Sequence, residues 1–361
     1  MITSYSKCRL LLFQLTLFII IILVLEIGLR VIYFQRNSEY PLAVIAGYHH
    51  VNFFLQHRNR PFSIISLSEK EAHKDDPVLG YSHNPGIYPI LIKQTSFFTE
   101  KDYKFKIIIG EDGYRITSEN PDKYKGKPQI WIFGCSYTFG WTLDEKDTFA
   151  WLIQQKLPNY QVKNLGMGGH GNTVGLLQLK QQITNGNTSA VAIFVYNPFH
   201  CVRNLAAPSF INNELSVHMN RSFHYPKSFI TEEGQLGIRL IPIKPINETE
   251  PSIKDMQAVT KLIFQEIQEI CYKNNIIPVL AFQTGDNNDP IVQYCAKNGF
   301  KIIDISINAD DSSLELLPGK YPMLPVKYQI FPPFDPHPNA EAHKIFAEKL
   351  FTGLLKFIHR Q

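Results

Sequence analysis

Short apolar segments alternate with amphipathic segments from about residue 127 onward, and this alternation constrains the fold more than any other feature. The segment QIWIF at 129–133 is typical of a buried strand, and TFAWLIQQKL at 148–157 has an apolar stripe at helical spacing. Strands that alternate with helices predict an α/β fold with a parallel sheet covered on both faces. The predicted strands cover 129–133, 160–166, 190–197, 276–283 and 300–306, and the predicted helices cover 148–157, 173–183, 254–274, a short segment around Val292 and a last segment from about Asn339 to the end.

An apolar run near the N-terminus is long enough to cross a bilayer. Residues 10–34 are rich in Leu, Ile and Phe, and about 20 such residues span the hydrocarbon core as a helix. The run continues into Glu26 and Arg30 instead of the small residues of a cleavage site, which favours an uncleaved anchor over a signal peptide. The alternative is a buried helix of a soluble fold. We expect a single transmembrane helix at 10–34, preceded by a short cytoplasmic tail at 1–9.

The segment between this helix and the α/β domain has a different pattern. Within 35–126, polar and apolar residues alternate around Asn-Pro-Gly and Glu-Asp-Gly turns, which is typical of short strands. We therefore expect 35–126 to form a connector and a small β-rich lead-in, followed by one domain at 127–361. With the tail in the cytoplasm, this domain is expected on the opposite, extracytoplasmic side of the membrane.

Charge and cysteine content exclude several classes of function. The chain has 36 Lys and Arg against 32 Asp and Glu, a net charge of +4, and lacks a long basic run, so nucleic acid is not an expected partner. Five cysteines occur without Cys-x-x-Cys pairs or a Cys/His cluster at metal spacing. No metal or cofactor is expected, one disulfide remains open, and oligomeric state is not predicted.

Polar residues follow several predicted strands at their carboxyl ends. Such ends meet at one edge of a parallel sheet, where loops form ligand sites. Gly134–Ser136 follows the first strand, Gly166–Asn172 the second and Asn197 the third, while Asp335 and His337 precede the last helix. The sequence predicts that one crevice receives all of them.

Ser136, Asp335 and His337 have the chemistry of a nucleophile, an orienting acid and a base. A serine hydroxyl needs a base to take its proton. In an extended segment Asp335 and His337 project to the same side at roughly 7 Å between Cα atoms, close enough for the carboxylate to reach Nδ1. Cys135 faces the other way because successive residues leaving a strand alternate, so we expect it to pack behind Ser136.

The segments FGCSYTFG, NLGMGGHGN, strand-terminal Asn197 and DPHPNAEAHKIFAE resemble the blocks of the SGNH hydrolase superfamily, the GDSL-like lipases and acylhydrolases. The resemblance covers about 127–361 and implies a three-layer, flavodoxin-like domain. It also implies that Ser136 attacks an acyl carbonyl, with Gly169 and Asn197 as oxyanion donors and Asp335 orienting the base His337. The N-terminal anchor and the GEDGYR segment resemble membrane-attached bacterial members associated with surface polysaccharides, which implies that the domain at 127–361 lies in the periplasm.

Several of these residues and their neighbours also have alternative or purely structural interpretations. The glycines in GMGGHG resemble a phosphate-binding run, although the match to a dinucleotide motif is weak. His343 is a competing base and His170 reads as a surface histidine. His200 and Arg203 read as structural residues, and Asn339 as the cap of the last helix.

The sequence therefore predicts a serine esterase that removes acyl groups, with O-acetyl preferred, from a carbohydrate or polysaccharide through an acyl-serine. Three alternatives stay open: an O-acyltransferase acting on cell-envelope or exported polysaccharide, a lipid or thioester acylhydrolase, and a catalytically silent polysaccharide-binding or assembly subunit. The replacement of the family's usual Asn-Asp by Asn197-Pro198 is the main support for the silent subunit.

Overall fold

The computed structural model describes residues 14–22, 24–25, 62–65, 72–95, 100–216, 219, 222–307, 324–331 and 335–358. The chain divides into two units, one comprising Met1–Ser63 and Lys93–Lys101 and the other Ile64–Ile92 and Asp102–Gln361.

In the first unit, residues 14–22 and 24–25 are helical, with exposed apolar side chains that include Phe18 and Leu25. The remainder of the predicted transmembrane helix at 10–34 lies outside the described residues. Within the described residues, no helix has the length and apolar character needed to traverse a bilayer.

A five-stranded parallel sheet forms the centre of the second unit. Its strands lie in the order β12-β11-β8-β6-β7, and every neighbouring pair is parallel. All residues of the central strand β8 are buried, as expected for a strand covered on both faces. The predicted α/β fold with a parallel sheet is therefore confirmed. The strands are β6 (Gln129–Phe133), β7 (Gln161–Asn164), β8 (Val191–Tyr196), β11 (Ile277–Phe282) and β12 (Lys301–Asp304).

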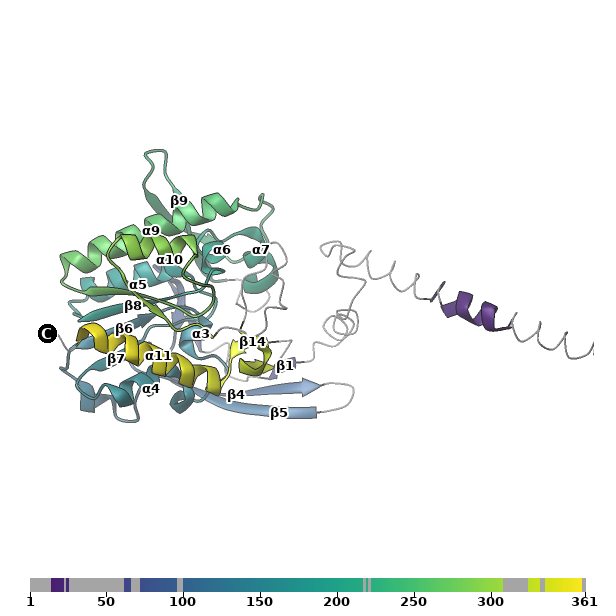
Figure 1. Ribbon diagram of the computed structural model, residues 1–361, viewed down its shortest axis with the longest axis horizontal. Helices are drawn as coiled ribbons and strands as arrows, with labels where there is room; N and C mark the ends of the chain where they lie inside the picture. Colours follow the sequence, from purple (N-terminus) through teal and green to yellow (C-terminus); the bar gives the residue numbers. More distant parts are fainter. Residues whose placement is uncertain are drawn as a thin grey trace, which may run out of the picture. The chain divides into compact units, whose positions relative to one another are not determined.

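Helices cover both faces of this sheet (Figure 1). Helices α4 (Phe149–Lys156) and α11 (Ala340–Ile358) pack on one face, and α5 (Asn172–Thr184), α9 (Ile253–Lys273) and α10 (Pro290–Lys297) pack on the other. Each helix presents an apolar stripe to the strands.

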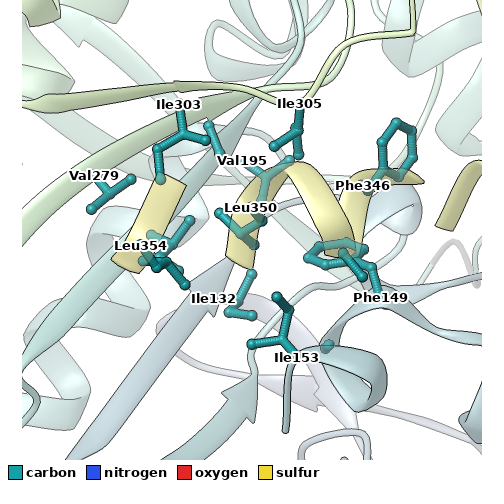
Figure 2. Packing of buried hydrophobic residues seen from close by; sticks show 14 of the residues in the cluster. Ile132, Phe149, Ile153, Val195, Val279, Ile303, Ile305, Phe346, Leu350 and Leu354 are labelled. Atoms are coloured by element: carbon teal, nitrogen blue, oxygen red, sulfur yellow. The ribbon is translucent and has the colours of Figure 1, made fainter. Parts of the chain in front are cut away.

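Figure 2 shows how α11 fills the core on its face of the sheet. Phe346, Leu350 and Leu354 are fully buried and face Ile132 of β6 and Val279 of β11. Burying an aliphatic or aromatic side chain of this size contributes about 1.5–3 kcal/mol. The C-terminal helix is therefore a major part of the core.

The strand order places a switch point at the carboxyl end of β6. Chain connections from β6 lead to β7 on one side, and β8 then lies on the other side of β6. In open α/β sheets a crevice forms where the connections diverge in this way. The residues that follow β6 are thus in the position expected for a site.

Smaller elements surround the sheet. The lead-in contains hairpin β2–β3, strands β4 and β5, which pair in the order β1-β4-β5, and a 3₁₀ turn, and the 200–250 region folds as short helices and a β9–β10 hairpin. Their bounds are β1 (Phe62–Ile65), β2 (His73–Asp76), β3 (Gly80–His83), β4 (Gly86–Thr95), β5 (Glu100–Ile109), η2 (Pro121–Tyr124), α3 (Ser136–Phe139), η3 (Glu145–Asp147), α6 (His200–Asn204), α7 (Pro208–Phe210), η4 (Ile211–Leu215), β9 (His224–Ile230), β10 (Leu236–Pro242), η5 (Val326–Tyr328), β13 (Gln329–Phe331) and β14 (Asp335–Pro338).

Candidate active site

Ser136 is the first residue of helix α3, directly beyond strand β6. Cys135 precedes it in an extended conformation, so the chain changes direction between the strand and the helix. The turn packs closely on the sheet: a Cβ on Gly134 would collide with the Thr138 side chain, and one on Gly166 would lie 2.5 Å from the Phe139 nitrogen. These two glycines allow the serine to sit at the rim of the sheet, where it is 8% exposed.

The structure brings His337 and Asp335 to this serine from strand β14. His337 Nε2 lies 2.8 Å from Ser136 Oγ, and His337 Nδ1 lies 2.5 Å from Asp335 Oδ1. The same Asp335 oxygen accepts the His337 backbone N–H at 2.9 Å. The carboxylate therefore fixes both the ring and the backbone of the histidine.

Tyr137 holds the histidine from a second direction. Its hydroxyl donates to the Pro336 carbonyl at 3.0 Å, and its ring meets the His337 ring edge-on at 5.2 Å between centroids. Burial raises the pKa of Tyr137, so its hydroxyl remains a neutral donor at neutral pH. The residue after the serine thus ties helix α3 to strand β14, a role that the sequence analysis did not assign.

The Ser136, His337 and Asp335 side chains form a continuous hydrogen-bonded relay. With Nδ1 protonated and bonded to the carboxylate, Nε2 is left as an acceptor for the serine proton. Asp335 and His337 are each 22% exposed, so the relay is reachable from solvent. This arrangement can activate a serine hydroxyl for attack on a carbonyl carbon.

Cys135, the residue before Ser136, lies in the apolar core and not at the rim of the sheet. It is fully buried and belongs to the apolar cluster beneath α4 and α11, so the prediction that it packs behind Ser136 is confirmed. The four cysteines within the described residues, Cys135, Cys201, Cys271 and Cys295, are free and buried; Cys8 lies outside the described residues.

Gly169 lies in the loop between β7 and α5 with a φ of 74°, a backbone conformation that favours glycine. Two tyrosine hydroxyls hold this loop by its carbonyls: Tyr81 donates to Gly168 at 2.7 Å and Tyr225 donates to Gly169 at 3.2 Å. A Cβ on Gly169 would lie 2.7 Å from the Tyr81 hydroxyl. Side chains from two hairpins therefore restrain this loop.

Asn197 follows strand β8 and has no exposed surface. Its Nδ2 donates to Gln283 Oε1 at 3.1 Å, and its Oδ1 accepts the Thr284 hydroxyl at 2.8 Å. Both partners follow β11, the neighbouring strand. An amide nitrogen has two hydrogens, and the bond to Gln283 uses one of them.

Three histidines that the sequence analysis singled out are buried, namely His170, His200 and His343. The prediction of a surface His170 is wrong, because it is only 1% exposed and lies against Tyr81. The competing base His343 is fully buried on α11, and its Nδ1 accepts the Phe149 N–H at 3.0 Å. Burial lowers the pKa of His343 to about 3, so this side chain is neutral and structural. Burial also lowers the pKa of His170 and His200.

Asn339 and Arg203 act in the packing of the fold. Asn339 Oδ1 accepts the Ala342 N–H at 3.0 Å, so the predicted cap of the last helix is confirmed. Arg203 lies over the Phe199 ring at 4.5 Å and pairs with Glu214 at 3.3 Å. Within the described residues, no group of three or more His, Cys, Asp or Glu side chains is arranged to hold a metal ion.

No protein-family model and no curated protein matches the chain. Among solved structures, a G-D-S-L family lipolytic protein from Desulfitobacterium hafniense is 14% identical with a TM-score of 0.35, over 63% of this chain and 100% of that chain. A G-D-S-L family lipolytic protein from Veillonella parvula is 13% identical with a TM-score of 0.34, over 64% of this chain and 99% of that one. TesA is 13% identical with a TM-score of 0.35, over 63% and 98%.

These neighbours include members of the family whose motifs the sequence resembles.

Proposed function

We propose that the protein is a serine esterase that cleaves acyl esters through a covalent acyl-serine. The observation that carries this proposal is the relay from Ser136 through His337 to Asp335, with distances of 2.8 and 2.5 Å. His337 lies 201 residues after Ser136 and 2 residues after Asp335. No packing requirement explains the alignment of a hydroxyl at the rim of the sheet with an imidazole and a carboxylate that are each 22% exposed.

The first half of the reaction forms the acyl-serine. His337 Nε2 takes the Ser136 proton as Oγ attacks the ester carbonyl, and the carbonyl oxygen becomes an oxyanion. When the intermediate collapses, the ester bond breaks and the imidazolium returns the proton to the departing alkoxide, releasing an alcohol. Asp335 stabilises the positive charge that His337 holds between these steps.

The second half regenerates the serine. His337 takes a proton from water, the resulting hydroxide attacks the acyl carbonyl, and the carboxylic acid departs as Oγ recovers its proton. In both halves the oxyanion needs donors. The proposal assigns this role to the Ser136 and Gly169 backbone N–H groups and to the Asn197 side chain.

The proposed substrate is an O-acetylated carbohydrate or polysaccharide of the cell envelope. The apolar N-terminal run supports attachment to a membrane, with the α/β domain on the extracytoplasmic side. The sequence resemblance to membrane-attached members associated with surface polysaccharides supports the sugar. An acyltransferase would use the same acyl-serine but pass the acyl group to a sugar hydroxyl instead of water.

The test uses the full chain in detergent with p-nitrophenyl acetate and with an O-acetylated polysaccharide, and measures released p-nitrophenol and acetate. We expect turnover of both substrates by the wild type and none by Ser136→Ala, with Cys135→Ala retaining activity as the matched control. Acetate release that persists in Ser136→Ala would refute the mechanism. Acetyl transfer to an added sugar without release of acetate would identify the transferase. Wild-type protein that releases neither product and transfers no acetyl group would favour the silent subunit.

A further inference from the structure

Helix α3 is too short to satisfy its own carbonyl groups. It comprises only Ser136–Phe139 and ends at Gly140, which has a left-handed conformation. The last carbonyls of any helix have no partner within it. In this helix Asn164 of β7 donates from Nδ2 to the Thr138 carbonyl at 3.2 Å and to the Phe139 carbonyl at 3.4 Å, and Arg115 supplies further donors.

Arg115, from the lead-in, binds the last carbonyl of the helix and two carbonyls of the turn that follows it. Its Nη1 donates to the Phe139 carbonyl at 3.0 Å and to the Gly140 carbonyl at 2.6 Å, and its Nη2 donates to the Leu143 carbonyl. Its guanidinium also lies over the Phe139 ring at 5.0 Å. One side chain therefore binds three carbonyls at the end of the helix and in the turn that follows it.

The two peptide groups that Arg115 holds are the same two that bind the serine. The N–H of Gly140 donates to the Ser136 carbonyl at 2.9 Å, and the N–H of Trp141 donates to it at 3.1 Å. A peptide unit is planar and rigid, with its C=O and N–H pointing in opposite directions. In each unit the guanidinium binds the carbonyl oxygen, and the N–H binds the Ser136 backbone carbonyl. A displacement of the Arg115 guanidinium would therefore move the Ser136 backbone through a single rigid peptide group.

The guanidinium is itself held in place. Arg115 is 2% exposed, and its Nη2 lies 3.3 Å from Glu145 Oε1. That carboxylate oxygen also accepts the Ile108 N–H at 2.6 Å. Placing a full charge in the interior is costly unless it is paired and hydrogen-bonded. The two terminal nitrogens of the planar guanidinium serve three carbonyls and a carboxylate together, while its Nε has no partner among the described residues.

We infer that Arg115 is a positioning residue that sets the Ser136 hydroxyl against His337 by clamping the two peptide groups after helix α3. The inference rests on the proposed function, because it gives Ser136 the role of nucleophile. Arg115 does not touch the substrate. Its loss shifts the serine and lowers the rate of the chemical step while substrate binding is preserved.

The experiment compares Arg115→Met and Arg115→Lys with a control variant that has the same melting temperature but leaves the turn around Ser136 unchanged. Ile267, buried in α9 on the other face of the sheet, provides it: Ile267→Val or Ile267→Ala is chosen to match the melting temperature of each Arg115 variant. For the full chain in detergent, well below every melting temperature, the measurements are kcat and KM with p-nitrophenyl acetate and the rate of Ser136 labelling by a fluorophosphonate.

We expect Arg115→Met to lower kcat and the labelling rate together by about 10²-fold, the effect of a misplacement near 1 Å, with KM changed less than about threefold. Arg115→Lys keeps the positive charge but loses the planar guanidinium, so its kcat and labelling rate should lie between those of Arg115→Met and the wild type. The matched Ile267 variant should keep wild-type rates. Arg115 variants that label as fast as the Ile267 control would overturn the inference and leave the proposed function intact. Absence of labelling in the wild type would overturn both.

Discussion

The carboxyl ends of strands β6 and β8 both present polar residues, but in opposite settings. After β6, the Ser136 hydroxyl points to His337 on a distant strand, and the histidine and its carboxylate partner are each 22% exposed. After β8, Asn197 has no exposed surface and bonds to Gln283 and Thr284 after the neighbouring strand. One strand end directs its polar group to a relay reachable from solvent, and the other ties two strand ends together.

We therefore expect the residues after β6 to affect mainly the catalytic rate and Asn197 after β8 to affect the free energy of unfolding as well. A partly exposed relay contributes little to the free energy of unfolding, since solvent replaces its hydrogen bonds. A buried amide with two internal bonds contributes to it directly, because removing the amide strands its partners. Substitutions at the two strand ends should therefore have different signatures.

The largest effect is expected at the accessible relay. Asp335→Asn keeps the size of the side chain but favours the wrong tautomer of His337, so kcat for p-nitrophenyl acetate should fall about 10⁴-fold. The melting temperature should stay close to that of the wild type. Steady-state kinetics and thermal unfolding of the same preparation measure both. A rate within tenfold of wild type would remove Asp335 from the relay.

A smaller loss of rate, accompanied by a loss of stability, is expected at Asn197. Asn197→Ala removes a proposed oxyanion donor, which lowers kcat by about 10²–10³-fold. It also leaves Gln283 and Thr284 without their bonds, which lowers the free energy of unfolding by about 1–3 kcal/mol.

Thr284→Val is the matched control for Asn197, because it removes the bond to Oδ1 and leaves Nδ2 in place. It should lower stability alone, as followed by urea unfolding and by kcat. If Asn197→Ala also changed only the stability, the amide would be a strand tie and its oxyanion role would be rejected.

The same contrast extends to His343, the buried histidine of helix α11. His343 is buried and its pKa is lowered to about 3, below the usual value near 6.5. As pH falls below about 6.5, the unfolded chain binds a proton that the folded chain does not, so stability falls with decreasing pH until about pH 3.

His343→Asn should flatten this dependence, because an Asn Oδ1 can accept the Phe149 N–H without titrating. Between pH 6 and pH 4 the slope of the free energy of unfolding should decrease by up to about 1.4 kcal/mol per pH unit. Chemical denaturation across this range measures the slope for both proteins. Parallel curves for wild type and variant would show that His343 is not buried in its neutral form.

The smallest effect is expected at Cys135. Its side chain is buried behind the serine turn, so Cys135→Ala loses only a small apolar contact and should cost about 1 kcal/mol of stability. The kcat should remain within about threefold, since the relay is untouched. A loss of activity as large as that in Asp335→Asn would move the nucleophile from Ser136 to Cys135.

Local pattern in the sequence predicted the parts of the site that depend on strand ends. The buried strand at 129–133 is followed by Ser136, and the spacing of Asp335 and His337 in a proline-bounded extended segment placed both side chains on one side. Their meeting with Ser136 followed from the rule that polar loops gather at the switch point of a parallel sheet.

The partners that act across the fold were not predictable in the same way. Nothing in the GEDGYR segment indicates that Arg115 reaches carbonyls 24–28 residues further along the chain, because that contact depends on how the lead-in packs. The burial of His170 and the bonds of Asn197 to Gln283 and Thr284 likewise arise from tertiary neighbours. The spacing of residues in the sequence indicates neither the burial of His170 nor the partners of Asn197.

The long separation between Ser136 and His337 also bears on when activity can appear during synthesis. The base is supplied 201 residues after the nucleophile, and helix α11, which covers one face of the sheet, follows it. A nascent chain that ends before β14 contains the serine turn but lacks both His337 and the helix that covers one face of the sheet. The hydrogen-bonded relay can therefore form only after the chain has been synthesised through β14, and the covered sheet only after it has been synthesised through α11.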